Sequence, residues 1–283
     1  MKRTLILFMC GFFCLATFAQ NEKKQGDDMA SAGNYSGAAM MYRLCMEQDE
    51  ECLFRLIRLL YEKKIEPQAP NELFLLVNPP ALNGNAEAQL YLGILFNKGI
   101  GVSEDNREAL KWIQKSVDQG YADAQNEFGK MHQMGLLVSR NDAEAVKLYQ
   151  LSAEQGHVEA QYNLGYMYHK QLGIKKDKKV QPLKEAVKWY EKSANQGNSK
   201  AQNCLGLMYQ QGEGVKKNIQ EAVVWFQKSA GQGNAEGQYN LGLLYEMGQG
   251  VVKNMDKAID LYQKASAQGH KLAAAKVKKL KRK

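Results

Sequence analysis

The sequence lacks long apolar runs and catalytic motifs. Beyond residue 19, no stretch approaches the roughly 18 consecutive apolar residues that a membrane-spanning helix needs. The chain contains no Ser-x-x-Lys box, no Gly-x-Ser-x-Gly elbow, no Gly-x-x-x-x-Gly-Lys-[Ser/Thr] loop and no His-Glu-x-x-His helix. Common sequence signatures of serine hydrolases, phosphate-loop enzymes and zinc proteases are therefore missing.

Histidine is also scarce, with only 4 in the chain. A zinc site needs ligands at short helical spacing or convergent cysteines, and no histidine has such a neighbour. We therefore expect no metal and no cofactor. One histidine, His132, takes the place that an aromatic residue holds in other parts of the chain, which predicts a buried or half-buried ring.

The first 19 residues differ from the rest. Lys2 and Arg3 are followed by an apolar stretch over residues 5–16. Thr17 and Ala19 then place small side chains at the two positions that an export peptidase reads, which predicts cleavage after Ala19. This pattern is typical of a cleaved signal peptide. We expect residues 1–19 to be removed and the protein to be exported, to the periplasm or the medium. A retained membrane anchor is the alternative.

Few cysteines belong to the mature chain. Cys45 falls near the end of one predicted helix and Cys52 near the start of the next, so the pair could meet across the turn. An exported compartment would allow them to oxidise, and we leave open whether they are bonded. Cys204 is then unpaired, and a spare small residue is a simpler interpretation than a reactive thiol.

Charge is concentrated at the ends. Of the net charge of +8, two charges belong to Lys2 and Arg3 and seven to the basic residues from Lys271 onward. The part between them is nearly neutral, whereas a nucleic-acid-binding protein would spread basic residues along its binding face. We expect no nucleic acid partner. The basic tail is either a solvated terminal helix or a weak contact with an anionic surface.

Five copies of one unit follow each other, at residues 85–120, 121–156, 157–197, 198–233 and 234–269. A glycine row has spacings of 36, 36, 41 and 36 residues and consists of Gly93, Gly129, Gly165, Gly206 and Gly242. A second row has spacings of 36, 41, 36 and 36 residues and consists of Trp112, Leu148, Trp189, Trp225 and Leu261. Such a period predicts stacked units that bury their apolar faces against their neighbours.

Each unit reads as two helices. In residues 198–233, apolar residues recur at helical spacing over 201–211, and glycines then stop the helix. Asn218 is the expected N-cap of a second helix that ends near Gly231. Glycine inside a helix costs up to about 1 kcal/mol relative to alanine. A glycine at each first-helix centre therefore implies close approach of a bulky aromatic residue from the second helix, which places the tryptophan row in the core.

Residues 160–168 (AQYNLGYMY) and 185–197 (EAVKWYEKSANQG) resemble the Sel-one-like repeat (SLR) family, a relative of the tetratricopeptide repeats. The resemblance covers residues 85–269. It implies an all-α fold, a right-handed α/α superhelical solenoid of antiparallel helix pairs. It also implies an adaptor that binds proteins or peptides, with no shared catalytic residues and hence no enzyme. The alternative is a β-lactamase-like or cell-wall hydrolase, as described for cysteine-rich relatives.

The ends of the array depart from the repeat. Residues 20–84 are expected to form degenerate repeats that cap the N-terminus, with a short helix over 71–77 ended by Pro79 and Pro80. Residues 270–283 are expected to form a basic C-terminal cap, in which Lys278 takes the place of the repeat glycine. The third unit has a five-residue insertion within 175–182, which predicts a longer loop.

One row of the first helices is predicted to face away from the core, toward the concave side. Its members are Tyr91, Ile94, Glu127, Lys130, Asn163, Tyr166, Cys204, Leu207, Asn240 and Leu243. Apolar side chains with amides beside them suit an amphipathic or extended peptide. The alternative is that this row packs against a neighbouring unit.

Overall fold

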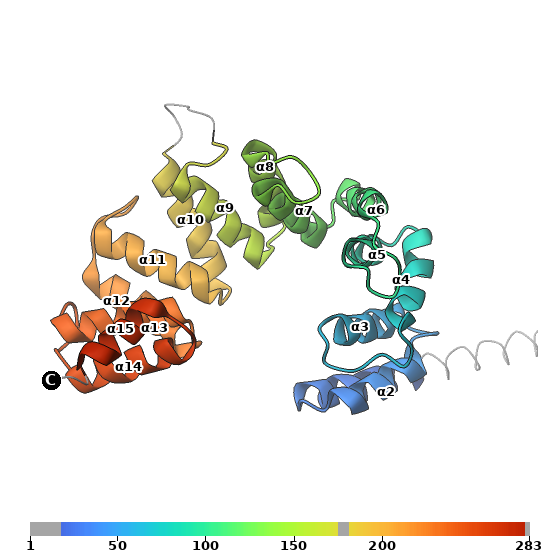
Figure 1. Cartoon of the computed structure of the whole chain (residues 1–283), viewed down its shortest axis with the longest axis horizontal. Helices are drawn as coiled ribbons and strands as arrows, with labels where there is room; N and C mark the ends of the chain where they lie inside the picture. The colour runs from blue at the N-terminus through green and yellow to red at the C-terminus, as the bar shows by residue number, and fades with distance from the viewer. Residues whose placement is uncertain (1–17, 175–180, 281–283) are drawn as a thin grey trace, which may run out of the picture. The chain divides into compact units, whose positions relative to one another are not determined.

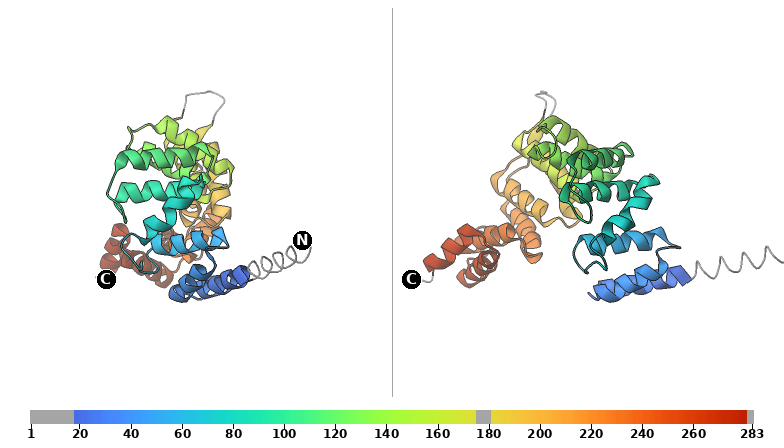
Figure 2. Two further views of the ribbon diagram at one scale, coloured as in Figure 1. Left: turned by 90° about the vertical axis from the view of Figure 1, so that its right-hand side faces the viewer. Right: turned by 45° about the vertical axis from the view of Figure 1, so that its right-hand side comes forward.

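The computed structural model describes residues 18–174 and 181–280, which form helices joined by short connections and include no strand (Figure 1 and Figure 2). The chain divides into two compact units, one ending at Gln119 and the other beginning at Gly120. Residues 18–31 are helical. The following helices are α2 (Tyr35–Cys45), α3 (Glu50–Tyr61), α4 (Glu72–Leu82), α5 (Ala86–Lys98), α6 (Asn106–Asp118), α7 (Ala122–Met134), α8 (Asp142–Glu154), α9 (Val158–Lys170), α10 (Pro182–Asn195), α11 (Ser199–Gln211), α12 (Ile219–Gly231), α13 (Ala235–Met247), α14 (Met255–Ala267) and α15 (Lys271–Leu280).

The five repeats are helix pairs, from α5 with α6 to α13 with α14. Ser116, near the end of α6, donates a hydrogen bond from Oγ to the carbonyl oxygen of Ala86 at the start of α5, at 2.6 Å. The start of one helix therefore lies beside the end of the other. The predicted all-α repeat of antiparallel helix pairs is confirmed.

Local capping explains where these helices begin and end. The Asn218 side chain accepts hydrogen bonds from the backbone N–H groups of Gln220 and Glu221, which fixes the start of α12. Before it, α11 stops at Gly212, whose φ of 82° lies in the left-handed region that favours glycine. The predicted N-cap and stop signal of this unit are confirmed.

In each helix pair, the glycine of the first helix meets a bulky side chain of the second. This side chain is an aromatic ring in the second to fifth repeats, as predicted, but it is Ile113 in the first repeat. A β-carbon on Gly165 would lie only 2.7 Å from Cδ1 of Tyr190. The tryptophan row is buried as expected, except for the half-buried Leu261. Each member precedes by one position the side chain that meets the glycine, and it fills another interface. Trp189 packs with Tyr149 and Leu164 of the preceding pair and its own first helix. Thus adjacent aromatic residues serve two different contacts.

The N-terminal region is also helical and contains α2, α3 and α4, but one expectation for it needs correction. The prediction that Pro79 and Pro80 end the third of these helices is wrong, because α4 continues through both. Leu73, Val77 and Ala81 are all buried in the core of this unit. Packing on both sides of the proline pair outweighs the loss of two backbone donors.

Beyond the fifth repeat, α15 takes the position of a sixth first helix. Ala273 is fully buried against α14, and Lys276 Nζ lies 2.7 Å from Glu246 Oε2. In the described ranges no helix is both long and apolar enough to cross a bilayer. Residues 1–17 of the predicted signal peptide, residues 175–180 of the predicted insertion and the last three residues of the predicted tail lie outside the described residues.

Candidate protein-binding surface

The first helices of the second unit contact one another along the array. Nδ2 of Asn163 on α9 donates to Oδ1 of Asn126 on α7 at 3.0 Å. Two repeats later, Nδ2 of Asn240 on α13 donates to Oδ1 of Asn203 on α11 at 2.9 Å. Because Asn126 and Asn203 are buried, these bonds fix the spacing of neighbouring helices. The second unit therefore presents a surface that runs from one first helix to the next.

Every member of the predicted binding row lies on a first helix and is half-buried. Tyr91 and Ile94 lie on α5 of the first unit. The others lie on α7, α9, α11 and α13 of the second unit: Glu127, Lys130, Asn163, Tyr166, Cys204, Leu207, Asn240 and Leu243. The Lys130 and Glu127 side chains form an ion pair at 2.5 Å, so this part of the row adds no net charge.

Half-burial reflects a double role of the apolar members. Tyr166 packs against the core clusters of the third and fourth repeats, and Leu207 and Leu243 pack against those of the fourth and fifth. Part of each side chain therefore packs between repeats, and the rest stays accessible to solvent. The row therefore packs against neighbouring units and also leaves accessible surface, which were the two alternatives drawn from the sequence. Its role in binding stays a prediction.

A depression of about 360 Å³ opens where the first turns of α9 and α11 meet. It is lined by Val158, Glu159, Tyr162, Gly197, Asn198, Ser199, Lys200 and Gln232. Glu159 and Lys200 are exposed and of opposite charge. Burial raises the pKa of Tyr162 to about 12, so its hydroxyl is a neutral hydrogen-bonding group at physiological pH.

The thiol of Cys204 lies half-buried in the same row. Burial raises its pKa to about 11, although the nearby Tyr190 acts in the opposite direction. The thiol is therefore protonated at neutral pH and lacks the thiolate that a cysteine nucleophile requires.

A ladder of glutamine side chains braces the helices beneath this surface. Gln196 Nε2 donates to Gln161 Oε1 at 2.8 Å, and Gln161 Nε2 donates to the carbonyl oxygen of Ala153 in the preceding repeat at 3.2 Å. The same glutamine pair occurs in the other repeats, as Gln119 with Gln89, Gln155 with Gln125, Gln232 with Gln202 and Gln268 with Gln238. This ladder was not predicted from the sequence. Its first-helix glutamines have the spacing of the glycine row and its second-helix glutamines have that of the tryptophan row, which was the available signal.

The histidines have structural roles. His157 Nδ1 accepts a hydrogen bond from the backbone N–H of Ala160 at 3.0 Å, which caps α9, and its Nε2 lies 2.7 Å from Asp123 Oδ1. His132 is half-buried, with its ring 4.7 Å from that of Phe128. Within the described ranges, no three His, Cys, Asp or Glu side chains gather in a way that could hold a metal ion.

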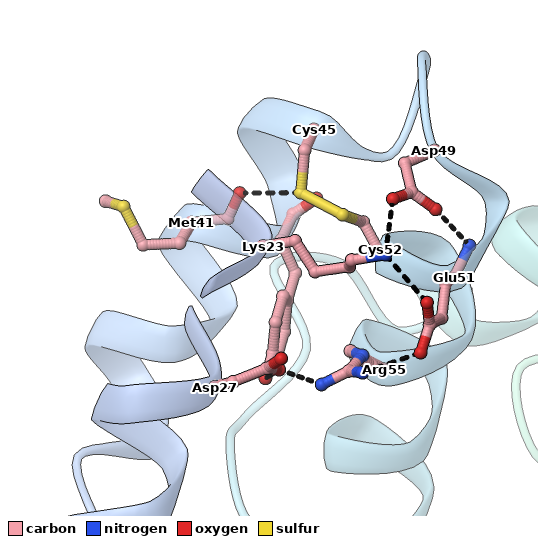
Figure 3. The surroundings of a disulfide bond; sticks show 9 residues. Lys23, Asp27, Met41, Cys45, Asp49, Glu51, Cys52 and Arg55 are labelled. Carbon is pink, nitrogen blue, oxygen red and sulfur yellow. Dashed lines mark hydrogen bonds and ion pairs between the residues drawn. A yellow bond between two sulfur atoms is a disulfide. The ribbon is translucent and has the colours of Figure 1, made fainter. Parts of the chain in front are cut away.

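A disulfide joins α2 and α3 in the first unit (Figure 3). It links Cys45, the last residue of α2, to Cys52 near the start of α3. Beside it, Lys23 Nζ lies 2.9 Å from Asp49 Oδ2 and 2.7 Å from Glu51 Oε2. A disulfide and two ion pairs therefore stabilise this turn.

Comparison with known proteins agrees with this repeated architecture. The Sel1 repeat model matches five times, over residues 86–121, 122–157, 158–198, 199–234 and 235–270. The chain belongs to the Sel1 repeat family. Each matched Sel1 repeat begins one residue after the corresponding unit defined from the sequence. The resemblance inferred from the residues is confirmed.

Two solved Sel1-type structures are similar to the chain. A Sel1 repeat protein from Oxalobacter formigenes is 32% identical with a TM-score of 0.70, covering 80% of this chain and 86% of that one. A protective antigen from uropathogenic Escherichia coli that displays an SLR fold is 30% identical with a TM-score of 0.67, covering 93% and 56%. A search of curated proteins found no match to the chain.

Sel1 repeat proteins generally act as scaffolds for protein–protein interactions. Their fold is typically a non-enzymatic one. These general properties agree with the adaptor role implied by the sequence resemblance, and they direct attention to the surface of the first helices.

Proposed function

We propose that this Sel1 repeat protein is an exported scaffold that binds a protein or peptide across the first helices of its second unit. The observation that carries the proposal is the row of half-buried apolar side chains beside amide pairs that bond one helix to the next. A rigid glutamine ladder holds these helices in place, so little ordering accompanies binding.

The chemistry of the row fits a peptide ligand. Each asparagine amide carries both donors and an acceptor, so it can bond a peptide group in either direction. Tyr166, Leu207 and Leu243 offer apolar contact beside these amides, and exposed Glu159 and Lys200 flank the depression between α9 and α11. An extended or amphipathic segment with alternating apolar side chains matches this arrangement.

Site-specific crosslinking tests the location. A photoreactive amino acid is placed at Lys200, and a matched protein carries it at Val224, an exposed residue on the second helix α12. Both are exposed to the exported proteins of the source organism. We expect a defined adduct from position 200 and none from position 224. Equal labelling from both positions would reject this surface.

Substitution provides the second arm of the test. Tyr166→Asp with Leu207→Asp should reduce adduct formation at least tenfold, because a charge replaces apolar contact. The control is Leu151→Asp with Val224→Asp, two residues that are each 41% exposed on second helices. Circular dichroism verifies folding of every variant. Undiminished capture by a folded Tyr166→Asp, Leu207→Asp protein would overturn the proposal.

Export rests on the basic and apolar pattern of the first 19 residues, and the Cys45–Cys52 disulfide supports it because such bonds persist in oxidising compartments. Mass spectrometry of the protein recovered from cell fractions tests this. We expect a chain that begins at Gln20 in the periplasm or medium. An unprocessed chain confined to the cytoplasm would contradict export.

The C-terminal helix supports a second, weaker contact with an anionic surface. Lys271, Lys278 and Lys279 on α15 are exposed, and the sequence adds three more basic residues after it. We expect binding to anionic phospholipid vesicles that weakens steeply with salt and is lost in the Lys271→Glu, Lys278→Glu, Lys279→Glu variant. Equal binding to zwitterionic vesicles would count against this contact.

A further inference from the structure

Asparagine and histidine both occur at one position of the array, the cap before a first helix. Asn85, Asn198 and Asn234 hold it in three repeats, and each side chain accepts a hydrogen bond from the backbone N–H three residues later. His157 holds it in the third repeat, and His270 holds it before α15. In both histidines, Nδ1 of the ring takes the place of the asparagine oxygen.

The histidine caps require a neutral ring with its hydrogen on one particular nitrogen. Nδ1 of His270 accepts the backbone N–H of Ala273 at 3.1 Å, so this nitrogen must carry a lone pair. The hydrogen is then on Nε2, which lies 3.1 Å from Oε2 of Glu236. His157 makes the same two contacts, with a backbone N–H of α9 and a carboxylate of α7.

Protonation of the ring is incompatible with this cap. An imidazolium carries an N–H on both nitrogens, so the Nδ1–H of His270 would face the N–H of Ala273 with no acceptor between them. The cation would also lie at the N-terminal end of a helix, where the macrodipole disfavours positive charge. Attraction to Glu236 compensates little, because that side chain is 64% exposed and ion pairs in water are weak. The charged ring therefore leaves the cap.

The other groups around His270 do not replace the lost bond. Tyr239 of α13 stacks on the ring with centroids 4.6 Å apart, and Tyr262 of α14 lies 5.7 Å from Tyr239. A stacked ring cannot accept the Nδ1–H, which points outward in the plane of the imidazole. The carbonyl oxygen of Ala265 on α14 already accepts the backbone N–H of His270. Lys271, the next residue, is a further cation and opposes a second positive charge.

The helices that follow the two histidine caps are held differently. α9 packs between the helices of the preceding and the following repeat. α15 is the last helix of the described residues, with neighbours on one side only (Figure 1). Besides its cap, the buried Ala273 and the ion pair of Lys276 with Glu246 hold it. Although burial acts in the opposite direction, hydrogen bonds from Lys276 and Tyr262 lower the pKa of Glu246, so this ion pair persists in mild acid.

We propose that protonation of His270 releases α15 from the end of the array under mildly acidic conditions. Imidazole is the side chain that changes its charge between pH 5 and 8. On release, Ala273 leaves its buried position, and the half-buried Tyr239 and Leu243 of α13, which pack against the same cluster, gain exposure. Acid thus adds accessible apolar surface at the C-terminal end of the array. This release does not depend on what the first helices bind.

Hydrogen exchange of the whole protein, followed by mass spectrometry, tests the proposal. The measured quantity is the protection factor of residues 271–280, corrected for the intrinsic pH dependence of exchange. It should fall about tenfold between pH 7.5 and 5.5, because the neutral ring is needed only in the packed state. Protection of α11, which has the asparagine cap Asn198, should stay within about twofold. Unchanged or increased protection of α15 at pH 5.5 would overturn the proposal.

Asparagine provides the matched variant, because the chain itself uses it at this position. His270→Asn supplies a cap that does not titrate, so α15 should be equally protected at both pH values. His270→Ala removes the cap at every pH and should lower protection at pH 7.5 toward that of the acidified wild type. His157→Asn, the control, should leave the pH dependence of α15 unaltered. A pH-dependent loss that persists in His270→Asn, or full protection in His270→Ala, would contradict the assignment to this ring.

Discussion

The five repeats and the N-terminal region are both built from helix pairs, but different forces hold them. In the repeats, similar contacts recur: a bulky side chain, a ring in four of the five repeats, against a glycine; a tryptophan or leucine at one register position; and a glutamine ladder. Around α2 and α3, the Cys45–Cys52 disulfide and the ion pairs of Lys23 and Arg55 take their place. Arg55 pairs with Asp27 of the preceding helical segment.

This difference follows from position in the array. An internal repeat buries its faces against a neighbour on each side, so nearest-neighbour packing supplies most of its stability. A terminal pair lacks one neighbour and must replace that contribution. A crosslink does so by restricting the unfolded chain, without requiring another apolar surface. A disulfide and packing against a neighbouring pair are therefore alternative ways to stabilise a helix pair.

The strongest test of this contrast compares one register position in both regions. Trp189→Ala in the third repeat should lower the free energy of unfolding by about 3 to 5 kcal/mol, because it empties a buried contact between pairs. Leu76→Ala on α4 removes a half-buried side chain and should cost clearly less. Urea unfolding at neutral pH measures both. Equal losses would show that the two regions are packed alike.

Removal of the crosslink should affect mainly the N-terminal region. Cys45→Ser opens a loop with a sequence separation of 7, for which chain entropy predicts a loss of about 2 to 3 kcal/mol. Trp112 belongs to the core cluster that contains Cys45 and Cys52, whereas Trp189 and Trp225 lie in the second unit. In a Trp112→Phe background, tryptophan fluorescence therefore follows the second unit while circular dichroism follows every helix. We expect an earlier transition in dichroism alone. A parallel shift in tryptophan fluorescence would contradict local stabilisation.

Overpacking the glycine row should show that the repeats depend on close approach. A β-carbon on Gly206 would lie 2.5 Å from Cε1 of Phe226, so Gly206→Leu should cost roughly 1 to 3 kcal/mol. At Gly231, near the end of α12, a β-carbon would meet nothing within 4 Å. Gly231→Leu serves as the control, with a change below about 0.5 kcal/mol. Similar losses at both glycines would reject the packing explanation.

The buried tyrosines of the repeats should make the protein sensitive to alkali. Burial is the largest cause of the raised pKa of Tyr149, Tyr162, Tyr190 and Tyr262. Their stabilising contribution is complete below the unfolded pKa of about 10 and declines above it, by up to about 1.4 kcal/mol per pH unit for each ring. Tyr190→Phe should therefore reduce the pH dependence of unfolding above pH 10 and leave stability at pH 7 nearly unchanged. An unaltered alkaline profile would be inconsistent with this assignment.

Much of the fold follows from short-range signals in the sequence. The periodic glycines, the Asn218 cap and the stop at Gly212 are local features, and the structure uses each as expected. The distinction between Trp189 and Tyr190 was not accessible in this way. Consecutive helical residues lie about 100° apart, so both can belong to one broad apolar face, and only the neighbouring helices decide which interface each fills.

Long-range packing accounts for what the sequence did not reveal. Local sequence rules predict that a helix ends before Pro79 and Pro80. Burial of Val77 and Ala81 instead stabilises α4 through and beyond the two prolines. The glutamine ladder joins side chains about 30 residues apart, and its residues look like ordinary polar surface when read one helix at a time. The residues of the predicted binding row lie on the first helices, and their half-burial depends on contacts between repeats that the sequence does not reveal.

One feature of α15 limits how copies of this chain can assemble. Lys278 stands where each repeat carries its glycine, and Ala274 stands where each repeat carries the ladder glutamine. An aromatic ring from another copy would meet a lysine stem there, and its glutamine would find no amide. Stacking of another copy on α15 is therefore expected to be unfavourable, because two of the contacts that hold helices together in the repeats would be missing.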